Sequence, residues 1–123
     1  MQLSGSFEIT LELQQDEQFP AGRMLINKQY TGGLEGIGIG QMLSKRTEAG
    51  ASVYAAIEEF EGKVNGKQGS FTLFHTGQMS ASSQELNIIV IEGSGAGELE
   101  GITGKLTITL SNDVHSYVFE YSF

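Results

Sequence analysis

Apolar and polar residues alternate along most of this chain with a period of two, the spacing that turns one face of a β-strand toward a core. In residues 7–13 the stretch FEITLEL puts four apolar residues on one face and three polar residues on the other. The same alternation predicts seven further strands, at 24–30, 37–44, 52–61, 67–76, 85–91, 106–110 and 117–123. The segment nearest to a helical pattern, 41–60, is interrupted by Gly50 and alternates in its second half, so no helix is predicted.

Turn residues separate these strands. Asn65-Gly66 is the strongest short hairpin signal in the chain, because both central residues of a type I′ turn need a positive φ. Asn112-Asp113 suits a second tight turn. Glycines at 32–33 and 93–97 predict bends or bulges. A phrase of an apolar residue followed by Glu-Gly recurs at four strand boundaries: 34–36, 60–62, 91–93 and 99–101.

Eight antiparallel strands in 123 residues form either a sandwich or a closed barrel, in one domain that spans residues 1–123. The barrel is favoured because closure removes exposed strand edges, and because 17 glycines allow a small sheet to bend tightly. The sequence therefore predicts an all-β, closed eight-stranded antiparallel β-barrel. The interior of such a barrel is filled by side chains or holds one small ligand.

His75 lies on the apolar face of its predicted strand, and the preceding turn fixes what faces it. Counting outward from Asn65-Gly66 pairs Ala56 with His75, which leaves space beside the imidazole ring. Glu58 becomes a diagonal neighbour of His75 on the same inner wall, at roughly 7–8 Å between backbones. A slip of one residue would instead turn Glu59 inward and Glu58 to solvent.

A histidine and a glutamate on one inner wall have two interpretations. In a pocket they can act as general acid and base, which makes His75 and Glu58 the candidate catalytic residues. Alternatively, two buried polar side chains satisfy one another and serve only the packing. The sequence leaves both interpretations open.

The second turn places His115. Counting outward from Asn112-Asp113 puts His115 opposite Leu110, at the turn end of an inward row that continues through Tyr117. We interpret His115 as a rim residue at the barrel mouth, with a ligand contact as the alternative. The two histidines are about forty residues apart and lack a cluster of acidic partners, so no metal site is predicted.

The amino-acid composition excludes several classes of binding partner for this protein. Seven basic and 15 acidic residues give a net charge of −8, which disfavours nucleic acid and anionic membranes. The chain has no cysteine, no signal peptide in its first residues and no apolar run of about 18 residues, so a cytoplasmic protein is expected. The glycine-rich segment 93–101 has glutamate where a dinucleotide fingerprint needs its third glycine, and no cofactor is predicted.

Residues 88–91, Ile-Ile-Val-Ile, are apolar on both faces of the predicted strand. A barrel strand has a polar outer face unless something covers it. A subunit interface that includes Ile89 and Ile91 would provide the cover, and a terminus or long loop is the alternative. We therefore expect a homo-oligomer, with a homodimer as the simplest form.

Four segments, YTGGLEGIG, GSFTLFHTG, GSGAGELEGITG and HSYVFEYSF, resemble a bacterial family of proteins with a domain of unknown function. The resemblance runs from about Arg23 to Phe123 and extends to the allene oxide cyclase-like, calycin-like barrels. It implies a closed antiparallel barrel with a small hydrophobic cavity, and oligomers, but no known activity. The positions that match the family's motifs are Glu58 or Glu59, His75, Gly93, Gly95, Gly97, Gly101, His115 and Tyr117. No segment reproduces the pattern of the plant cyclases, so their reaction is not carried over.

The function hypothesis that follows is a barrel that binds a small, largely apolar molecule in its lumen. Glu58 and His75 would orient a polar group of the ligand, in open space beside His75. The other predicted ligand-binding residues form the wall: Tyr54, Phe60, Phe71, Leu73, His115 and Tyr117. One alternative is an isomerase or cyclase that uses the His–Glu pair as acid and base. Another is a structural homo-oligomer with a packed barrel and no ligand.

Overall fold

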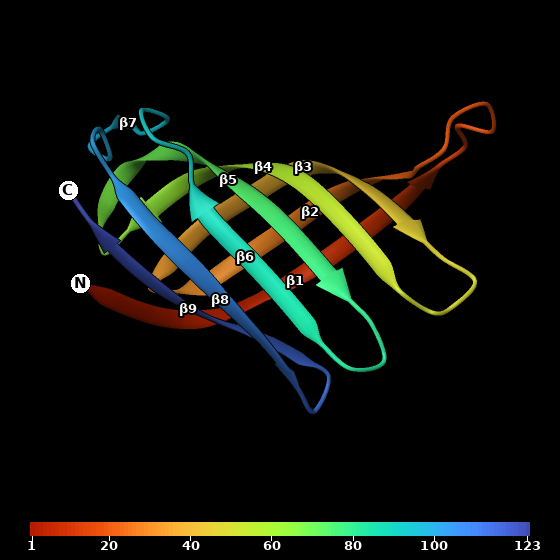
Figure 1. Cartoon of the computed structure of the whole chain (residues 1–123). Coiled ribbons are helices and arrows are strands. Elements are labelled where there is room, and N and C mark those ends of the chain that lie inside the picture. Colours follow the sequence, from red (N-terminus) through yellow and green to blue (C-terminus); the bar gives the residue numbers. More distant parts are fainter.

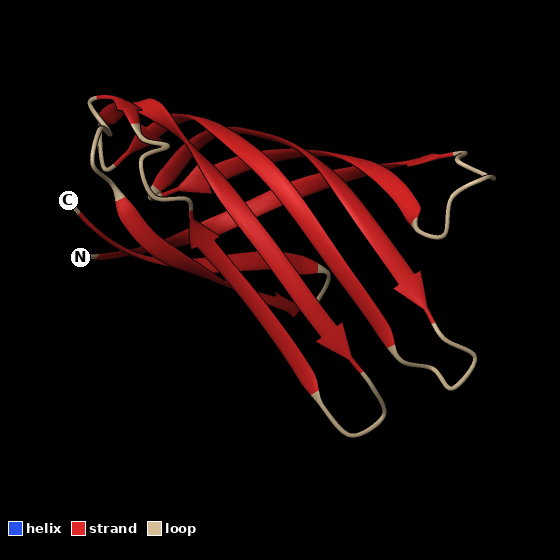
Figure 2. Ribbon diagram, turned by 45° about the horizontal axis from the view of Figure 1, so that its top comes forward, coloured by secondary structure: helices blue, strands red, loops and turns tan.

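The computed structural model describes residues 1–123 and contains only β-strands, turns and loops (Figures 1 and 2). The predicted all-β class is confirmed. The strands are β1 (Gln2–Gln14), β2 (Gly22–Gly32), β3 (Leu34–Arg46), β4 (Ser52–Val64), β5 (Lys67–Met79), β6 (Gln84–Val90), β7 (Ala96–Gly97), β8 (Thr103–Ser111) and β9 (Val114–Ser122).

Eight of these strands close into a barrel. The sheet runs β4-β3-β2-β1-β9-β8-β6-β5, all neighbours are antiparallel, and pairing of β4 with β5 completes the circle. The two-residue β7 adds a short pairing to β5 at Gly69 and Ser70. The predicted closed eight-stranded barrel is therefore confirmed, with strands that extend beyond the predicted bounds at most ends.

Both predicted tight turns are present. Asn65 and Gly66 have φ values of 49° and 83°, and Asn112 and Asp113 have 52° and 63°, so all four residues take the positive φ of a type I′ hairpin. Gly50, which interrupts the helix-like stretch, lies in the turn between β3 and β4 with a φ of 89°. The turn residues thus set the register of three hairpins.

The two ends of the barrel differ. At the end that we call the closed end lie both termini, the β2–β3 and β4–β5 turns and the segment 91–102 (Figure 1). This segment folds over the barrel, with the Glu98 amide donating to the Gln68 carbonyl at 2.9 Å. Its Leu99 and Ile102 side chains are fully buried and fill the opening.

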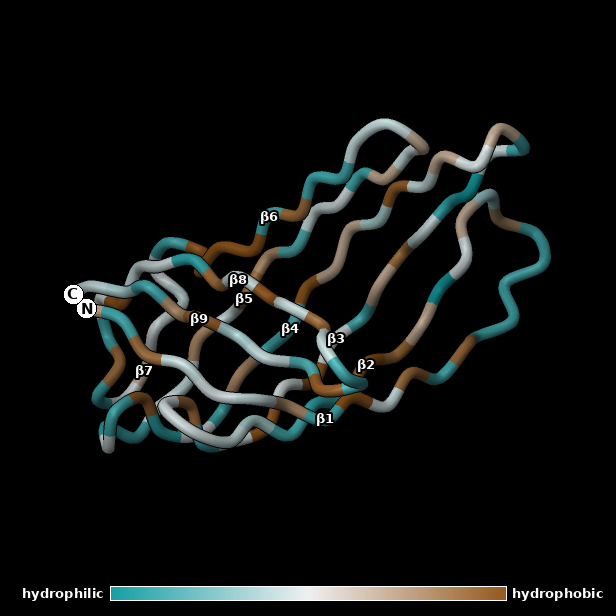
Figure 3. Tube along the Cα trace, turned by 90° about the horizontal axis from the view of Figure 1, so that it is seen from below, coloured by the Kyte–Doolittle hydropathy of each residue, from teal (hydrophilic) through white to brown (hydrophobic).

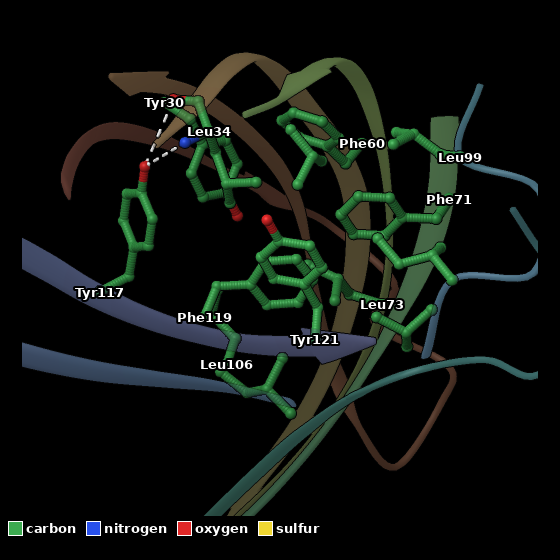
Figure 4. Packing of buried hydrophobic residues seen from close by; sticks show 14 of the residues in the cluster. Tyr30, Leu34, Phe60, Phe71, Leu73, Leu99, Leu106, Tyr117, Phe119 and Tyr121 are labelled. Carbon is green, nitrogen blue, oxygen red and sulfur yellow. Dashed lines mark hydrogen bonds between the residues drawn. The ribbon is translucent and has the colours of Figure 1, made fainter. Parts of the chain in front are cut away.

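The core lies at the closed end, where inward aromatic side chains from several strands meet (Figure 4). The Phe71 ring lies 4.9 Å from the Phe60 ring and 5.6 Å from the Phe119 ring, between centroids. The Tyr117 hydroxyl accepts a hydrogen bond from the Leu34 amide and donates one to the Thr31 carbonyl, both at 2.8 Å. Tyr117 therefore ties β9 to the β2–β3 turn.

At the opposite end, which we call the open end, lie the hairpin turns β1–β2, β3–β4, β5–β6 and β8–β9 (Figure 1). Strand β1 pairs with β9 only up to Phe7, and β6 pairs with β8 only between Ile89 and Lys105. The strands therefore separate toward this end. Their inward-facing leucines are substantially exposed: Leu86 is 43% exposed, Leu11 50% and Leu110 61%.

Strand β6 ends in three consecutive apolar residues, Ile88 to Val90, which form a hydrophobic stretch of the chain in Figure 3. Ile88 and Val90 point into the barrel and are buried, whereas Ile89 is 41% exposed on the outer face. Ile91, just beyond the strand, is 37% exposed. Within the chain itself, neither a terminus nor a loop buries the outer two isoleucines.

Candidate functional site

A polar cluster of four side chains lies inside the barrel, just beyond the aromatic core. Glu58 is fully buried at its centre. Its Oε1 accepts hydrogen bonds from Lys28 Nζ at 3.0 Å and from His75 Nε2 at 2.8 Å, and its Oε2 accepts one from the Tyr30 hydroxyl at 2.5 Å. Lys28 and His75 are each only 3% exposed. We call these four residues the Glu58 cluster.

The register that the Asn65-Gly66 turn predicts is observed. Ala56 pairs with His75 and Glu58 pairs with Leu73, so Glu58 and His75 are diagonal neighbours on the inner wall. Glu59 points outward and is exposed. The one-residue slip that would have exchanged the two glutamates does not occur.

Strand β3 makes room for the cluster between β2 and β4. Its inward positions in this stretch are all glycine, at Gly36, Gly38 and Gly40. Gly38 lies directly opposite Lys28, and a Cβ there would overlap Glu58 Oε2 and lie 3.0 Å from the Tyr30 ring. Because β3 has no side chain here, Lys28 and Tyr30 on β2 reach across it to the carboxylate on β4.

The surroundings of Glu58 decide its charge. Burial alone raises the pKa of a carboxylic acid, but the hydrogen bond from His75, the Lys28 charge and the hydrogen bond from Tyr30 outweigh it and lower the pKa of Glu58 to about 2. Burial, together with the adjacent carboxylate, raises the pKa of Tyr30 well above its usual range. Glu58 is therefore an anion at neutral pH, and Tyr30 remains a hydrogen-bond donor.

The His75 ring is oriented by its bond to Glu58. Since Nε2 donates to the carboxylate, Nδ1 is left as the acceptor in the neutral ring. Nδ1 has no hydrogen-bond partner within the chain. Since every fully buried side-chain nitrogen and oxygen has a partner, Nδ1 is not fully buried. Nδ1 consequently keeps some contact with solvent, and the residue that pairs with His75 across the strands is the small Ala56.

Lys28 also has unused hydrogen-bonding capacity. Its ammonium group makes one hydrogen bond, to Glu58, and lies 4.7 Å from the centre of the Phe7 ring. The His115 ring stacks on the same Phe7 ring at 5.1 Å. His115, half-buried near the β8–β9 turn, is thus connected to the cluster through one phenylalanine.

The remaining predicted site residues fall into two groups. Tyr54 is half-buried on the inner wall toward the open end, where its ring lies across Gly77. Burial, reinforced by the Glu58 charge, raises its pKa. The others are packed inside the core at the closed end, and whether they contact a ligand stays a prediction: Phe60, Phe71, Leu73 and Tyr117.

The sequence reasoning missed Lys28 and Tyr30 as members of the site. A signal was present, because Lys28 occupies an inward position between Ile26 and Tyr30 in an alternating strand. A lysine on an apolar face is almost never buried without a partner. The carboxylate that it pairs with lies two strands away, which the alternation within β2 does not reveal.

Other sites are less well supported. No group of three or more histidine, aspartate and glutamate side chains is arranged to hold a metal ion. The main hollows of the molecular surface include neither Glu58 nor His75 in their linings, so the enclosed cavity implied by the resemblance is not among them. The structure contains no helix with the length and apolar character needed to span a membrane.

Comparison with known proteins agrees with this architecture. The crystal structure of a protein of unknown function from Shewanella oneidensis MR-1, of the DUF3224 family, superposes with a TM-score of 0.92 at 34% sequence identity, over 100% of this chain and 96% of that one. A search of curated proteins gave no match. The kinship with allene oxide cyclase stays a prediction. The model of the family described as "Protein of unknown function (DUF3224)" matches residues 3–121, and the chain belongs to that family.

Proposed function

We propose that this protein binds a small, largely apolar molecule at the open end of its barrel, with one polar group of that molecule held by His75 and Lys28. The observation that carries the proposal is the inner wall itself, which stays apolar but becomes uncovered just beyond the buried Glu58 cluster. Apolar side chains that face inward and remain exposed lose the hydrophobic free energy of burial. A bound apolar molecule would restore it.

The wall available to a ligand comes from several strands. Leu11 and Leu13 of β1 are 50% and 66% exposed on it, and Met24 of β2, Met42 of β3 and Tyr54 of β4 are half-buried. Methionine side chains adapt to irregular ligands because they are unbranched and flexible. This composition favours hydrocarbon or aromatic ligands over sugars or nucleotides.

The floor of this space offers two different polar contacts. His75 Nδ1 can accept a hydrogen bond from a ligand hydroxyl, and the free protons of the Lys28 ammonium can be donated to a carbonyl or carboxylate. Glu58 is saturated by its three donors and holds both groups in place. A ligand with one hydroxyl, carbonyl or carboxylate on an apolar body matches this arrangement.

A fluorescent probe with an apolar body and one anionic group, 1-anilinonaphthalene-8-sulfonate, tests the proposal. Leu11→Gln alters the inner wall, and Val114→Gln alters an equally exposed position on the outer face of β9, at 50% and 51% exposure. We expect Leu11→Gln to weaken probe binding about three- to tenfold and Val114→Gln to leave it unchanged. Equal effects of the two variants, or no binding by the native protein, would contradict the proposal.

The natural ligand can be sought directly. Organic extraction of the purified protein followed by mass spectrometry should give a small apolar molecule that is absent after purification of a Leu11→Gln, Leu13→Gln double variant. The same extraction from the Val114→Gln variant provides the matched control and should retain the molecule.

A second candidate function is proton-transfer catalysis, such as isomerisation, and one observation favours it. Glu58 fixes the His75 ring with Nδ1 toward the lumen, which is the way a carboxylate orients a histidine base. Because the pKa of Glu58 is about 2, His75 rather than Glu58 would exchange the proton at neutral pH. Glu58 would then act as the positioning residue.

Deuterium incorporation separates catalysis from binding alone. The extracted molecule is incubated with native protein, with His75→Gln and with His115→Gln in D2O and examined by NMR. Catalysis predicts incorporation that His75→Gln slows by about 10²–10⁴ while ligand affinity is kept. Binding alone predicts no incorporation and a change in affinity of a few fold. A cytoplasmic location stays a prediction, which cell fractionation would test.

A further inference from the structure

The outer face of strands β3 to β6 carries a contiguous group of exposed apolar side chains. In β3 the glycines face inward and the isoleucines face outward, which is the reverse of the usual arrangement. Cross-strand pairing places Ile57 beside Phe74 and Phe74 beside Ile89. The group, which we call the outer apolar patch, consists of six residues that are 38–62% exposed: Ile39, Leu43, Val53, Ile57, Phe74 and Ile89.

The middle of this patch, at Ile57 and Phe74, is apolar, and the outward-facing Glu59, which pairs with Ile39, lies at its edge. Ile57 lies at its centre, flanked on β3 by Gln41 and on β5 by Phe74. The surface here is hollowed by a shallow groove whose lining includes Leu43, Ala55 and Ile57, with Arg23 as its one charged residue. A contiguous exposed apolar surface on an acidic molecule is typical of a face that is covered by a partner.

Charges flank the patch with opposite signs at its two ends. Lys45 on β3 pairs with Val53, four residues before Ile57, and Glu61 on β4 lies four residues after it. A two-fold axis that lies in the plane of the interface over Ile57 and runs across the strands would bring Lys45 of each copy next to Glu61 of the other. The patch is thus self-complementary in charge and in apolar character, which is what a two-fold interface requires.

We propose that the outer apolar patch binds a second copy of this chain, sheet against sheet, in a two-fold symmetric dimer centred on Ile57. The strands of the two copies pack face to face as in other aligned sheet pairs, which leaves the open end of each barrel free. The dimer is therefore independent of the ligand site proposed above. Ile89 contributes at the edge of the interface, whereas Ile57 and Phe74 form its middle.

The test is the mass of the full chain in solution, measured by light scattering and sedimentation from about 1 to about 100 µM. The native protein should have twice the 13.3 kDa mass of one chain at the upper concentrations. Ile57→Lys places two lysines against each other at the axis and should raise the dissociation constant at least about tenfold. Val114→Lys, at a similarly exposed position (51% against 56%) by the β8–β9 turn, should leave it unchanged.

A charge exchange tests the orientation of the two copies. Lys45→Glu and Glu61→Lys should each weaken the dimer about two- to tenfold, and the double variant should regain most of the native affinity. A circular dichroism spectrum confirms that each variant is folded. A native protein that is monomeric at every concentration overturns the proposal, as does a dimer that Ile57→Lys leaves intact; a monomer would leave the patch to a different protein.

Discussion

The closed and open ends of this barrel are built on the same alternation of residues but differ in what becomes of the inward side chains. At the closed end Phe60 and Leu99 are fully buried, while at the open end Leu11 and Leu110 on the same inner face are half exposed or more. The segment 91–102 covers the first end, and no segment of the chain covers the second.

Because of this difference, the closed end of the barrel serves mainly stability, and the open end is left for the proposed ligand binding. Burial of apolar area at the closed end supplies hydrophobic free energy, at about 25 cal/mol per Å². The open end leaves part of that free energy unused, so that a ligand can gain it. The Glu58 cluster lies at the boundary, where buried charges are fully paired and two polar groups still face the lumen.

The largest expected effect is at that boundary. Glu58→Gln removes the anion and leaves the Lys28 ammonium buried without its counter-charge, which should lower the free energy of unfolding by about 3–5 kcal/mol. The neighbouring Glu59→Gln, on the exposed outer face, should change it by less than about 0.5 kcal/mol. Urea denaturation of both variants measures the difference, and similar midpoints would show that Glu58 does not hold the cluster together.

The two ends can be compared directly with matched leucine substitutions. Leu99→Ala leaves a cavity beneath segment 91–102 at the closed end and should lower the free energy of unfolding by about 2–5 kcal/mol. Leu11→Ala, at a position that is half exposed, should cost less than about 1 kcal/mol. Thermal and urea unfolding of the two variants measure these losses of unfolding free energy. Equal losses would contradict the distinction between a filled and an open end.

Low pH should destabilise the protein through the Glu58 cluster. The pKa of Glu58 is lowered from 4.5 to about 2 in the folded chain, so its contribution is complete above about pH 5 and is lost as the pH falls toward 2. The loss amounts to about 3 kcal/mol as an order of magnitude. Unfolding free energies measured between pH 7 and pH 2 should therefore fall more steeply in the native protein than in Glu58→Gln, and parallel curves would contradict the assignment.

The smallest expected effect tests the space that β3 provides. Gly38→Ala inserts a methyl group against Glu58 and Tyr30 and should cost about 1–3 kcal/mol. Gly22→Ala, where the nearest atom is an ordinary contact at 3.6 Å, should be nearly neutral. Comparison of their melting temperatures shows whether the glycines of β3 are needed for the cluster.

The hairpin around Asn65-Gly66 was predictable in detail. A two-residue turn fixes every pairing of its strands, so Ala56–His75 and the inward position of Glu58 followed from counting residues. The same count from Asn112-Asp113 gave the pairing of His115 with Leu110. The family was also identifiable, from segments spread over most of the chain.

Strand β3 shows a feature that could not be predicted from turn positions and the alternation of residues. An apolar-inward rule would turn Ile37 and Ile39 toward the core, but the barrel turns Gly36 and Gly38 inward instead. The reason is space: Lys28 and Tyr30 on one side and Glu58 on the other occupy the volume that isoleucines would need. The outer apolar patch is the consequence on the opposite face.

By itself, then, the sequence determined the strands, the tight turns and the diagonal placement of His75 and Glu58, because a period of two and a two-residue turn are local properties of the chain. Only the tertiary structure decided that Lys28 and Tyr30 complete the site, and which end of the barrel is filled. Those outcomes depend on contacts between strands that are not neighbours and on where segment 91–102 folds, and they are set by the curvature of the closed sheet.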